Sequence, residues 1–339
     1  AHAAYDLAAG VNLYARNNAY FVYSPAFAFL FWLLAWLPTH TGLFAWSMLN
    51  FGVAGAALHR LLPEKTRRRG MLVALAGILT VTDADQSNLL IAGLMIFATL
   101  LYWRGRLALA AGAVVLGGIV KLFPLAAGIW ALKSRSPVAA LACLGVALAV
   151  VALLPLLVTS PDMLLMQYRT WAEVTLRDYA WRGWSVSNML FEFGLDLPVK
   201  PVELACLALG IAPILIRGHR FSPEQRLLAV ACLLITLVLA NHKSEVQSYV
   251  IAAIGLGIWY AMGSASWPRL AFAVITVLST APFYPAAGGI PEDWHTLLAV
   301  RRPFFPVRIV PYVLLWGVLQ WRLWRTDEPA APSPELKVR

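Results

Sequence analysis

Long apolar segments follow one another along this chain, and only short polar connections separate them. Several are shorter than the roughly 20 residues that a straight membrane span needs, so we expect the short ones to lie inside a bundle or to thin the membrane. Hydrophobic residues make up 60% of the chain and charged residues 13%, which is outside the soluble range. The sequence therefore predicts an all-α fold, a polytopic transmembrane helical bundle with outer-face loops and interfacial helices. The expected spanning segments are 43–62, 70–82, 88–103, 107–120, 122–133, 137–158, 201–217, 227–240, 247–263, 268–284 and 307–324.

The basic residues are concentrated in alternate connections and in the tail, which together hold 17 of the 27 lysines and arginines. By the positive-inside rule we place that side in the cytoplasm. The opposite, outer side holds 12 of the 17 acidic residues, so we expect any chemistry there. The rule also accounts for the net charge of +10 without a nucleic-acid partner. The basic residues in question are Arg60, Lys65, Arg67, Arg68, Arg69, Arg104, Arg106, Lys133, Arg135, Arg217, Arg220, Arg226, Arg269, Arg322, Arg325, Lys337 and Arg339.

Both ends of the chain depart from the apolar pattern. The first residues have the character of a polar loop, without an initial methionine or a signal peptide, so we expect a further segment upstream of Ala1. The segment 24–38 is short and bounded by prolines, and we interpret it as an interfacial or re-entrant helix on the outer face. We expect a single transmembrane domain over residues 1–326 and a disordered cytoplasmic tail over 327–339.

The largest outer-face connection, residues 159–200, is long enough to have structure of its own. Its first half has apolar residues at helical spacing and predicts a helix. Trp171, Trp181 and Trp184 suit a helix that lies at the level of the lipid headgroups. Such a helix is either an interfacial anchor or a lid over a cleft that holds a lipid-linked substrate.

The stretch 80–90, TVTDADQSNLL, places a cluster of polar side chains between two apolar runs. A charge near the bilayer centre costs at least about 2.5 kcal/mol even on a lenient insertion scale, so it needs a partner, water or a ligand. One interpretation is that these side chains line an outward cleft. The other is a turn in which Ser87 or Asn88 caps the following helix.

Lys121 lies in the stretch GGIVKLFPL, at the outer end of a short predicted helix, and Pro124 breaks the helix just after it. The ammonium group either extends along the apolar surface to the interface or faces a lipid phosphate. Both interpretations place the charge at the boundary of the apolar layer.

A third polar cluster, in LANHKSEVQSYVIA, contains Asn241, His242, Lys243 and Glu245 at the start of an outward-facing helix. The helix dipole and the unpaired N–H groups of a helix start favour an anion. The alternative is an ordinary hydrated turn.

Arg301, Arg302 and Arg308 stand on the side that should be poor in arginine. They either pair with Glu292 and Asp293 or hold phosphate oxygens through bidentate hydrogen bonds.

The chain resembles glycosyltransferase family 87, integral-membrane enzymes of the GT-C fold, in an ordered series of segments that spans nearly its whole length. The resemblance implies a bundle of GT-C type in a bacterial inner (plasma) membrane, with the site on the outer face. The segments are GVNLY, FVYSPAFAFLF, DADQSNLLIAGLM, AGAVVLGGIVKLFPL, WRGWSVSNML and NHKSEVQSYVIA.

By this resemblance the protein is a hexosyltransferase that moves a sugar, typically mannose, from a polyprenyl-phosphate donor to a lipid or glycan acceptor by direct displacement. No cofactor is expected. Participation of a divalent metal is left open, because no ligand cluster has convincing spacing.

The resemblance also implies roles for particular residues. The catalytic aspartate of the family falls a few positions before Ala1 and is therefore not in the chain, which leaves Asp83 and Asp85 as spare candidates, while Asp6 falls at an ordinary helical position. Asp85 stands where the family has the glycine of a G-Q-x-N turn. The candidates for binding the donor phosphate are Lys121, His242, Lys243, Arg301 and Arg302. The candidates for lining the cleft are Tyr23, Gln86, Asn88, Trp184, Asn188, Asn241 and Glu245.

Two other functions remain compatible with the sequence. A transporter or flippase of a lipid-linked or anionic substrate would also need buried charges and broken helices, although such proteins usually contain repeated halves, and we find no convincing repeat. A degenerate, non-catalytic relative of the enzymes is the second alternative, because the expected aspartate is missing.

Overall fold

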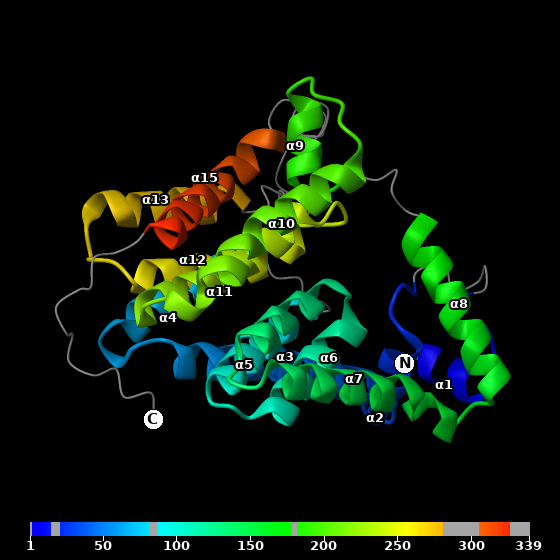
Figure 1. Ribbon diagram of the computed structural model, residues 1–339. Helices are drawn as coiled ribbons and strands as arrows, with labels where there is room; N and C mark the ends of the chain where they lie inside the picture. The colour runs from blue at the N-terminus through cyan, green and yellow to red at the C-terminus, as the bar shows by residue number, and fades with distance from the viewer. Residues whose placement is uncertain (1, 15–20, 82–86, 178–181, 281–304, 326–339) are drawn as a thin grey trace. The chain divides into compact units, whose positions relative to one another are not determined.

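The computed structural model describes residues 2–14, 21–81, 87–177, 182–280 and 305–325 of the 339-residue chain. Throughout these residues the regular elements are helices, so the all-α prediction is confirmed (Figure 1). The chain divides into two compact units, the first formed by residues 1–57 and 84–180 and the second by residues 58–83 and 181–339.

The first unit contains most of the N-terminal helices. They are α1 (His2–Ala8), α2 (Pro25–Ala35), the greater part of α3 (Thr39–Leu61), α5 (Asn88–Trp103), α6 (Leu107–Val120), the 3₁₀ helix η2 (Phe123–Lys133), α7 (Pro137–Leu153), η3 (Leu154–Leu157) and α8 (Pro161–Arg177).

The second unit contains the end of α3 and the C-terminal helices. They are α4 (Glu64–Val81), α9 (Val186–Glu192), α10 (Val199–Arg217), η4 (Gly218–Arg220), α11 (Pro223–Ala240), η5 (Val246–Ser248), α12 (Tyr249–Ala261), α13 (Trp267–Thr280) and α15 (Phe305–Trp324).

Each predicted spanning segment corresponds to a helix in the structure. In the described part of the chain, four helices are long and apolar enough to cross a membrane: Thr39–Leu61, Pro137–Leu157, Val199–Arg220 and Pro223–Ala240. The predicted span 122–133 is a 3₁₀ helix of 11 residues. Because a 3₁₀ helix rises about 2.0 Å per residue, η2 covers about 22 Å, compared with about 16 Å for an α-helix of the same length.

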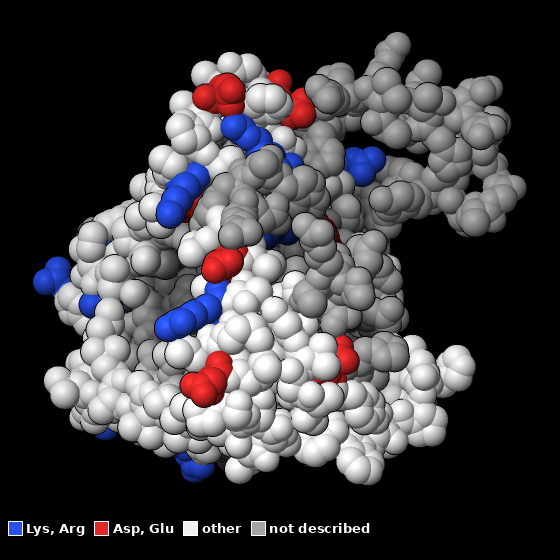
Figure 2. Space-filling model, turned by 90° about the vertical axis from the view of Figure 1, so that its right-hand side faces the viewer, with Lys and Arg blue, Asp and Glu red and all other residues white. Residues whose placement is uncertain are grey.

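The long helices differ strongly in burial. In α11, 83% of the most apolar window is buried, compared with 11% in the window of α7 and η3. The apolar side chains of α7 therefore face outward, as they do in a helix that contacts lipid, whereas α11 lies in the interior of the second unit. On the face shown in Figure 2, uncharged side chains cover most of the described surface.

The closest helix packing in the second unit joins α4 to α12, which lie side by side in Figure 1. A Cβ atom on Gly257 of α12 would lie 2.7 Å from Cβ of Ala74 and 2.6 Å from the carbonyl oxygen of Gly70. Glycine is thus required at position 257 because the two helix backbones approach each other there. Small residues at helix contacts are typical of membrane bundles.

Three helices of the second unit begin where three others end. Arg69 near the start of α4 binds the carbonyl oxygen of Ala261, the last residue of α12. Gln225 at the start of α11 and Arg217 at the end of α10 bind carbonyl oxygens at the end of α15. We name this region, with the start of α13, the arginine end of the second unit. Its composition agrees with the expected sorting of basic connections to one face.

Two expectations about the chain ends have different outcomes. The polar loop expected at the N-terminus is wrong, because residues 2–8 form α1, whose Leu7 packs with Leu13 and Ala28 in a small apolar core. The local composition suggests a loop, but burial of Leu7 in this core stabilises a helix. The expected disordered tail lies outside the described residues.

The segment 24–38 forms a helix, as predicted. Ser24 caps α2, since its hydroxyl accepts a hydrogen bond from the N–H of Phe27, and Pro25 occupies the first helical position. With 11 residues α2 is about 16 Å long, which is shorter than the roughly 30 Å hydrocarbon layer. Its interfacial or re-entrant placement stays a prediction.

Candidate functional site

Lys121 lies at the break between α6 and η2 in the first unit. Its backbone is extended, with φ −144° and ψ 140°, so the chain leaves the helix at this residue. The ammonium Nζ donates a hydrogen bond to Oδ1 of Asn88 at 2.9 Å, and Asn88 is buried at the start of α5. The lysine is half-buried, and its charge is held by an amide of the same unit.

The start of α5 does not have the capping arrangement that the sequence suggested for Ser87. Ser87 precedes the helix but makes no capping hydrogen bond, and its buried hydroxyl has no hydrogen-bond partner in the part of the chain that the structure describes. The oxygen of Asn88 instead faces Lys121. The capping interpretation is therefore wrong for Ser87, because the backbone before the helix has ψ near 0° rather than the extended conformation that a cap requires.

The start of α2 lies beside the end of α6. The hydroxyl of Ser24 donates a hydrogen bond to the carbonyl oxygen of Ile119 at 2.6 Å, two residues before Lys121. The adjacent Tyr23 packs its ring on Phe27, with centroids 4.8 Å apart. The segments FVYSPAFAFLF, DADQSNLLIAGLM and AGAVVLGGIVKLFPL thus meet around Lys121.

Helix α8 holds the chain that precedes α2. Gln167 is fully buried, and its amide accepts a hydrogen bond from the N–H of Leu13 at 3.0 Å and donates one to the carbonyl oxygen of Val11 at 2.7 Å. The indole N–H of Trp171 donates to the carbonyl oxygen of Val22 at 3.2 Å. The predicted helix in the large connection is confirmed, but a polar residue lies at the centre of its buried face, which apolar spacing alone does not reveal.

In the second unit, the loop after α11 pairs with the segment before α9. The N–H of Gly183 donates to the carbonyl oxygen of His242, and the N–H of Trp184 to that of Ser244, each at 2.6 Å. The hydroxyl of Tyr249 donates to the carbonyl oxygen of Trp184 at 3.0 Å. The segments WRGWSVSNML and NHKSEVQSYVIA therefore meet at the start of α12.

Trp184 differs from the sequence expectation. It was expected with Trp171 in a helix at the headgroup level, but α8 ends at Arg177 and Trp184 is buried, with its ring 5.9 Å from that of Tyr249. Arg308 of α15 lies over the same ring, 5.4 Å from its centroid. Burial against α12 and α15 therefore replaces the headgroup contact that Trp184 was expected to make. Trp181 lies outside the described residues.

His242 is buried and paired with a carboxylate. Its Nδ1 lies 3.3 Å from Oε1 of Glu203 in α10, and its side chain is 7% exposed, compared with 19% for that of Glu203. The other polar residues of the loop satisfy local backbone groups: Asn241 accepts from the N–H of Lys243 at 3.1 Å, and Glu245 forms a capping box with Ser248. Glu203 was not expected, and its place in the first turns of an apolar helix is the only sequence signal for it.

Asn188 lies in α9, where its side chain is buried and its N–H is directed to the hydroxyl of Ser185. Five other candidates lie outside the described residues: Asp83, Asp85, Gln86, Arg301 and Arg302. Across the residues that the structure does describe, no group of three or more His, Cys, Asp or Glu side chains is placed to hold a metal ion.

The model of glycosyltransferase family 87 matches residues 21–242, about two thirds of the chain. This range contains Asn88 and Lys121, and it ends at His242. The chain belongs to glycosyltransferase family 87. It is therefore a membrane glycosyltransferase, in agreement with its long apolar helices. Comparison with curated proteins finds no match.

Proposed function

We propose that this family 87 member transfers a hexose, with mannose as the first candidate, from a polyprenyl-phosphate sugar to a lipid or glycan acceptor. The protein acts in a bacterial inner membrane and the transfer takes place at its outer face. The observation that carries the proposal is the contact of Lys121 with Asn88 at the break between two apolar helices.

The position of Lys121 suits a lipid phosphate. A cation that is half-buried among apolar helices is costly unless it has a partner, and an ammonium group has three donors, so it can bind a phosphate oxygen as well as the amide oxygen of Asn88. The start of α5 adds the positive end of a helix dipole to the same place. Both features favour an anionic group at the boundary of the apolar layer.

We assign a direct displacement to this reaction. An acceptor hydroxyl attacks the anomeric carbon of the donor, a carboxylate removes the hydroxyl proton, and the bond from carbon to the phosphate oxygen breaks. Negative charge grows on the departing lipid phosphate, so a fixed cation stabilises the transition state more than the ground state. Lys121 is assigned this role, and Asp83 and Asp85 are the candidates for the base within the chain.

The His242 loop, in the second unit, is a further candidate for anion binding. The backbone pairing with Gly183 and Trp184 fixes the path of the loop, and Glu203 lies beside His242. Lys243 adds a cation next to it. These residues, with Arg301 and Arg302, are the further candidates for phosphate contact.

The test is sugar transfer by the full-length protein in membranes, with a polyprenyl-phosphate sugar and membrane acceptors. Lys121→Met keeps most of the apolar stem and removes the charge, so we expect the rate to fall about 100-fold or more while insertion survives. Lys121→Arg should recover only part of the rate, because its planar fork differs from an ammonium group. Lys133→Met, at the far end of η2, is the matched control and should transfer sugar at the parent rate.

Three outcomes would change the assignment. Parent activity in Lys121→Met would make the lysine an anchor and pass the phosphate role to the His242 loop. Absence of transfer by the parent with every polyprenyl-phosphate sugar, combined with movement of the lipid across the membrane, would favour a flippase. Binding of the donor with neither transfer nor movement would favour a degenerate relative.

A further inference from the structure

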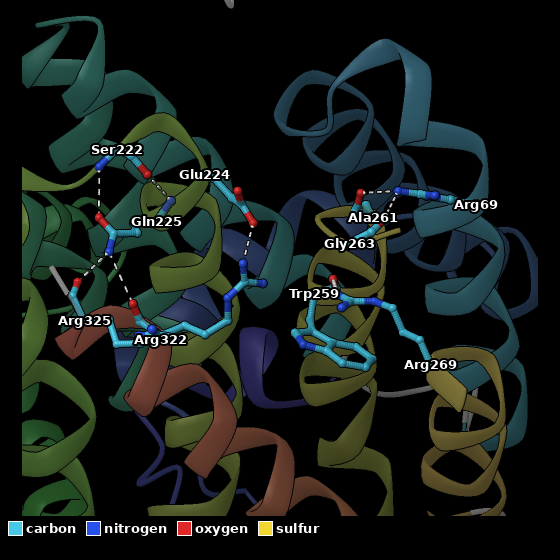
Figure 3. Close-up of polar contacts among 10 residues, drawn as sticks. All are labelled: Arg69, Ser222, Glu224, Gln225, Trp259, Ala261, Gly263, Arg269, Arg322 and Arg325. Carbon is cyan, nitrogen blue, oxygen red and sulfur yellow. Dashed lines mark hydrogen bonds and ion pairs between the residues drawn. The ribbon is translucent and has the colours of Figure 1, made fainter. Parts of the chain in front are cut away.

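Among the residues that the structure describes, the arginines at the arginine end of the second unit outnumber the carboxylates that pair with them. Arg69 and Arg269 both approach the carboxyl end of α12 from neighbouring helices, as Figure 3 shows. Arg69 donates to the carbonyl oxygens of Ala261, at 2.9 Å, and Gly263, while Arg269 donates to the carbonyl oxygen of Trp259. The guanidinium carbon of Arg269 also lies over the ring of Trp259, 3.7 Å from its centroid.

These contacts satisfy hydrogen-bond donors but leave charge uncompensated. A helix end provides only about half a negative charge, which is less than the two full positive charges of the guanidinium groups. In the described part of the chain, neither Arg69 nor Arg269 forms an ion pair with a carboxylate. The Nε–H groups of both are buried without a hydrogen-bond partner there.

Glu224 is the carboxylate described within electrostatic range of Arg269, and it is already engaged. It binds Arg322 of α15 at 3.0 Å, as the left side of Figure 3 shows. Arg69, Arg322 and Glu224 all lie within electrostatic range of Arg269. Three arginines therefore share one glutamate, and this cluster retains a net charge of about +2 when each arginine is fully protonated.

Exposed tryptophans surround the same helix ends. Trp267 begins α13 and is 78% exposed, and Trp321 and Trp324 lie in the last turns of α15 with 58% and 44% exposed. Arg325 lies over the ring of Trp321, 4.6 Å from its centroid. Tryptophan is enriched where the headgroups of a bilayer meet its apolar layer, so these side chains place the arginine end at that boundary.

We propose that the arginine end binds the phosphate of an anionic membrane glycerophospholipid through Arg69, Arg269 and Arg322. A phosphodiester supplies the missing negative charge, and guanidinium groups match its oxygens in a bidentate geometry. Lipid is the source rather than soluble phosphate, because the exposed tryptophans mark a surface that contacts headgroups and acyl chains. Basic pockets between membrane helices on the cytoplasmic side recognise anionic headgroups in this way.

This lipid site is separate from the His242 loop. Tyr249, which contacts Trp184, begins α12, and Ala261 ends it 12 residues later, so α12 separates the two ends by about 18 Å. A lipid headgroup at the arginine end therefore does not reach the His242 loop. Its binding does not depend on the glycosyltransferase reaction and can be measured without it.

The experiment uses the full chain in nanodiscs of phosphatidylcholine alone or mixed with phosphatidylglycerol. We expect phosphatidylglycerol to raise the unfolding temperature and to stay bound in native mass spectrometry, and high salt to weaken both effects. Inorganic phosphate in phosphatidylcholine discs should have no comparable effect. A parent protein that unfolds at one temperature in both discs, or that responds equally to inorganic phosphate, would overturn the proposal.

The variant Arg269→Gln removes the charge and keeps an N–H donor for the carbonyl oxygen of Trp259. It should bind phosphatidylglycerol about fivefold more weakly, the contribution of one arginine near an anionic surface. The matched control is Arg226→Gln, which removes an exposed arginine from the start of α11 at the same end. Equal weakening by both variants would mean general charge attraction and would overturn the site. If Arg269→Gln does not fold, the disc and phosphate measurements on the parent still decide the question.

Discussion

The polar residues around Lys121 and those around His242 are held in place by different kinds of contact. The ammonium of Lys121 donates to a side chain, the amide of Asn88, whereas the His242 loop is joined by backbone hydrogen bonds to Gly183 and Trp184. A side-chain contact is lost when one residue is replaced. Most side-chain replacements leave a backbone pairing intact. A replacement disrupts it only where the two backbone segments lie too close together for a Cβ atom.

Gly183→Ala should have the largest effect. A Cβ atom at this position would lie 2.9 Å from the carbonyl oxygen of His242 and closer still to that of Ser244, so the backbone pairing cannot survive unchanged. We expect about 3 kcal/mol of destabilisation, the upper part of the range for overpacking, together with loss of sugar transfer. Thermal unfolding in detergent and the transfer assay measure the two effects.

Gly145→Ala is the control for that substitution, because no atom lies within 4 Å of the added Cβ and the position is inside α7. It should leave stability unchanged or raise it by up to about 1 kcal/mol through helix propensity. An unfolding temperature for Gly183→Ala equal to that of Gly145→Ala would show that the pairing does not constrain the loop.

Asn88→Ala should have the next largest effect. The ammonium of Lys121 loses the hydrogen bond to this amide in a half-buried place, and a hydrogen bond to a charged group contributes about 1.5–3 kcal/mol. Asn88→Asp should instead keep or strengthen the contact, because a carboxylate also accepts the hydrogen bond and adds an opposite charge. Urea unfolding compares the two variants, and equal destabilisation by both would rule out the contact as a stabilising element.

Glu203→Gln should have a smaller effect on stability, about 1 kcal/mol, because the amide oxygen still accepts a hydrogen bond from His242 while the charge is lost. Thermal unfolding in detergent measures this effect. Asp196→Asn is the matched control, because it removes the carboxylate of another ion pair, with Arg182, whose aspartate is 72% exposed. An unfolding temperature of Glu203→Gln equal to that of Asp196→Asn would contradict the pairing.

The smallest predicted effect is on the pH dependence of stability and concerns Tyr168 in α8. Burial raises the pKa of Tyr168 to about 12 and also raises the pKa of Tyr14. In the unfolded chain Tyr168 ionises near pH 10, whereas in the folded protein it remains protonated, so folding stability is fully present below pH 10 and decreases as pH rises toward about 12.

Tyr168→Phe should make this alkaline loss of stability less steep, and at neutral pH it should cost about 1 kcal/mol or less through loss of the hydrogen bond to Ala152. Tyr5→Phe, at an exposed tyrosine, is the control. Unfolding temperatures measured from pH 9 to about 12 make the comparison. An alkaline transition of equal steepness in parent and Tyr168→Phe would assign it to other groups.

Helices were predicted far better than the contacts of polar residues. The segment 88–103 has the predicted ends, and 107–120 also agrees with α6, because a run of apolar residues bounded by charged residues is a local signal that persists in the fold. The α1 helix was missed, since its seven residues are stabilised mainly by packing of Leu7 against Leu13 and Ala28. Short helices depend on tertiary burial more than on their own propensity.

The sequence by itself determined that this protein is a membrane bundle of helices with polar breaks, because in lipid every backbone N–H and C=O group must be satisfied within its own segment. It also carried the ordered segments by which the family was recognised. Only the tertiary structure decided the partners of the polar side chains: Asn88 for Lys121, 33 positions away, and Glu203 for His242, 39 positions away. Such pairs depend on how helices pack against one another, and no local period in the sequence encodes that packing.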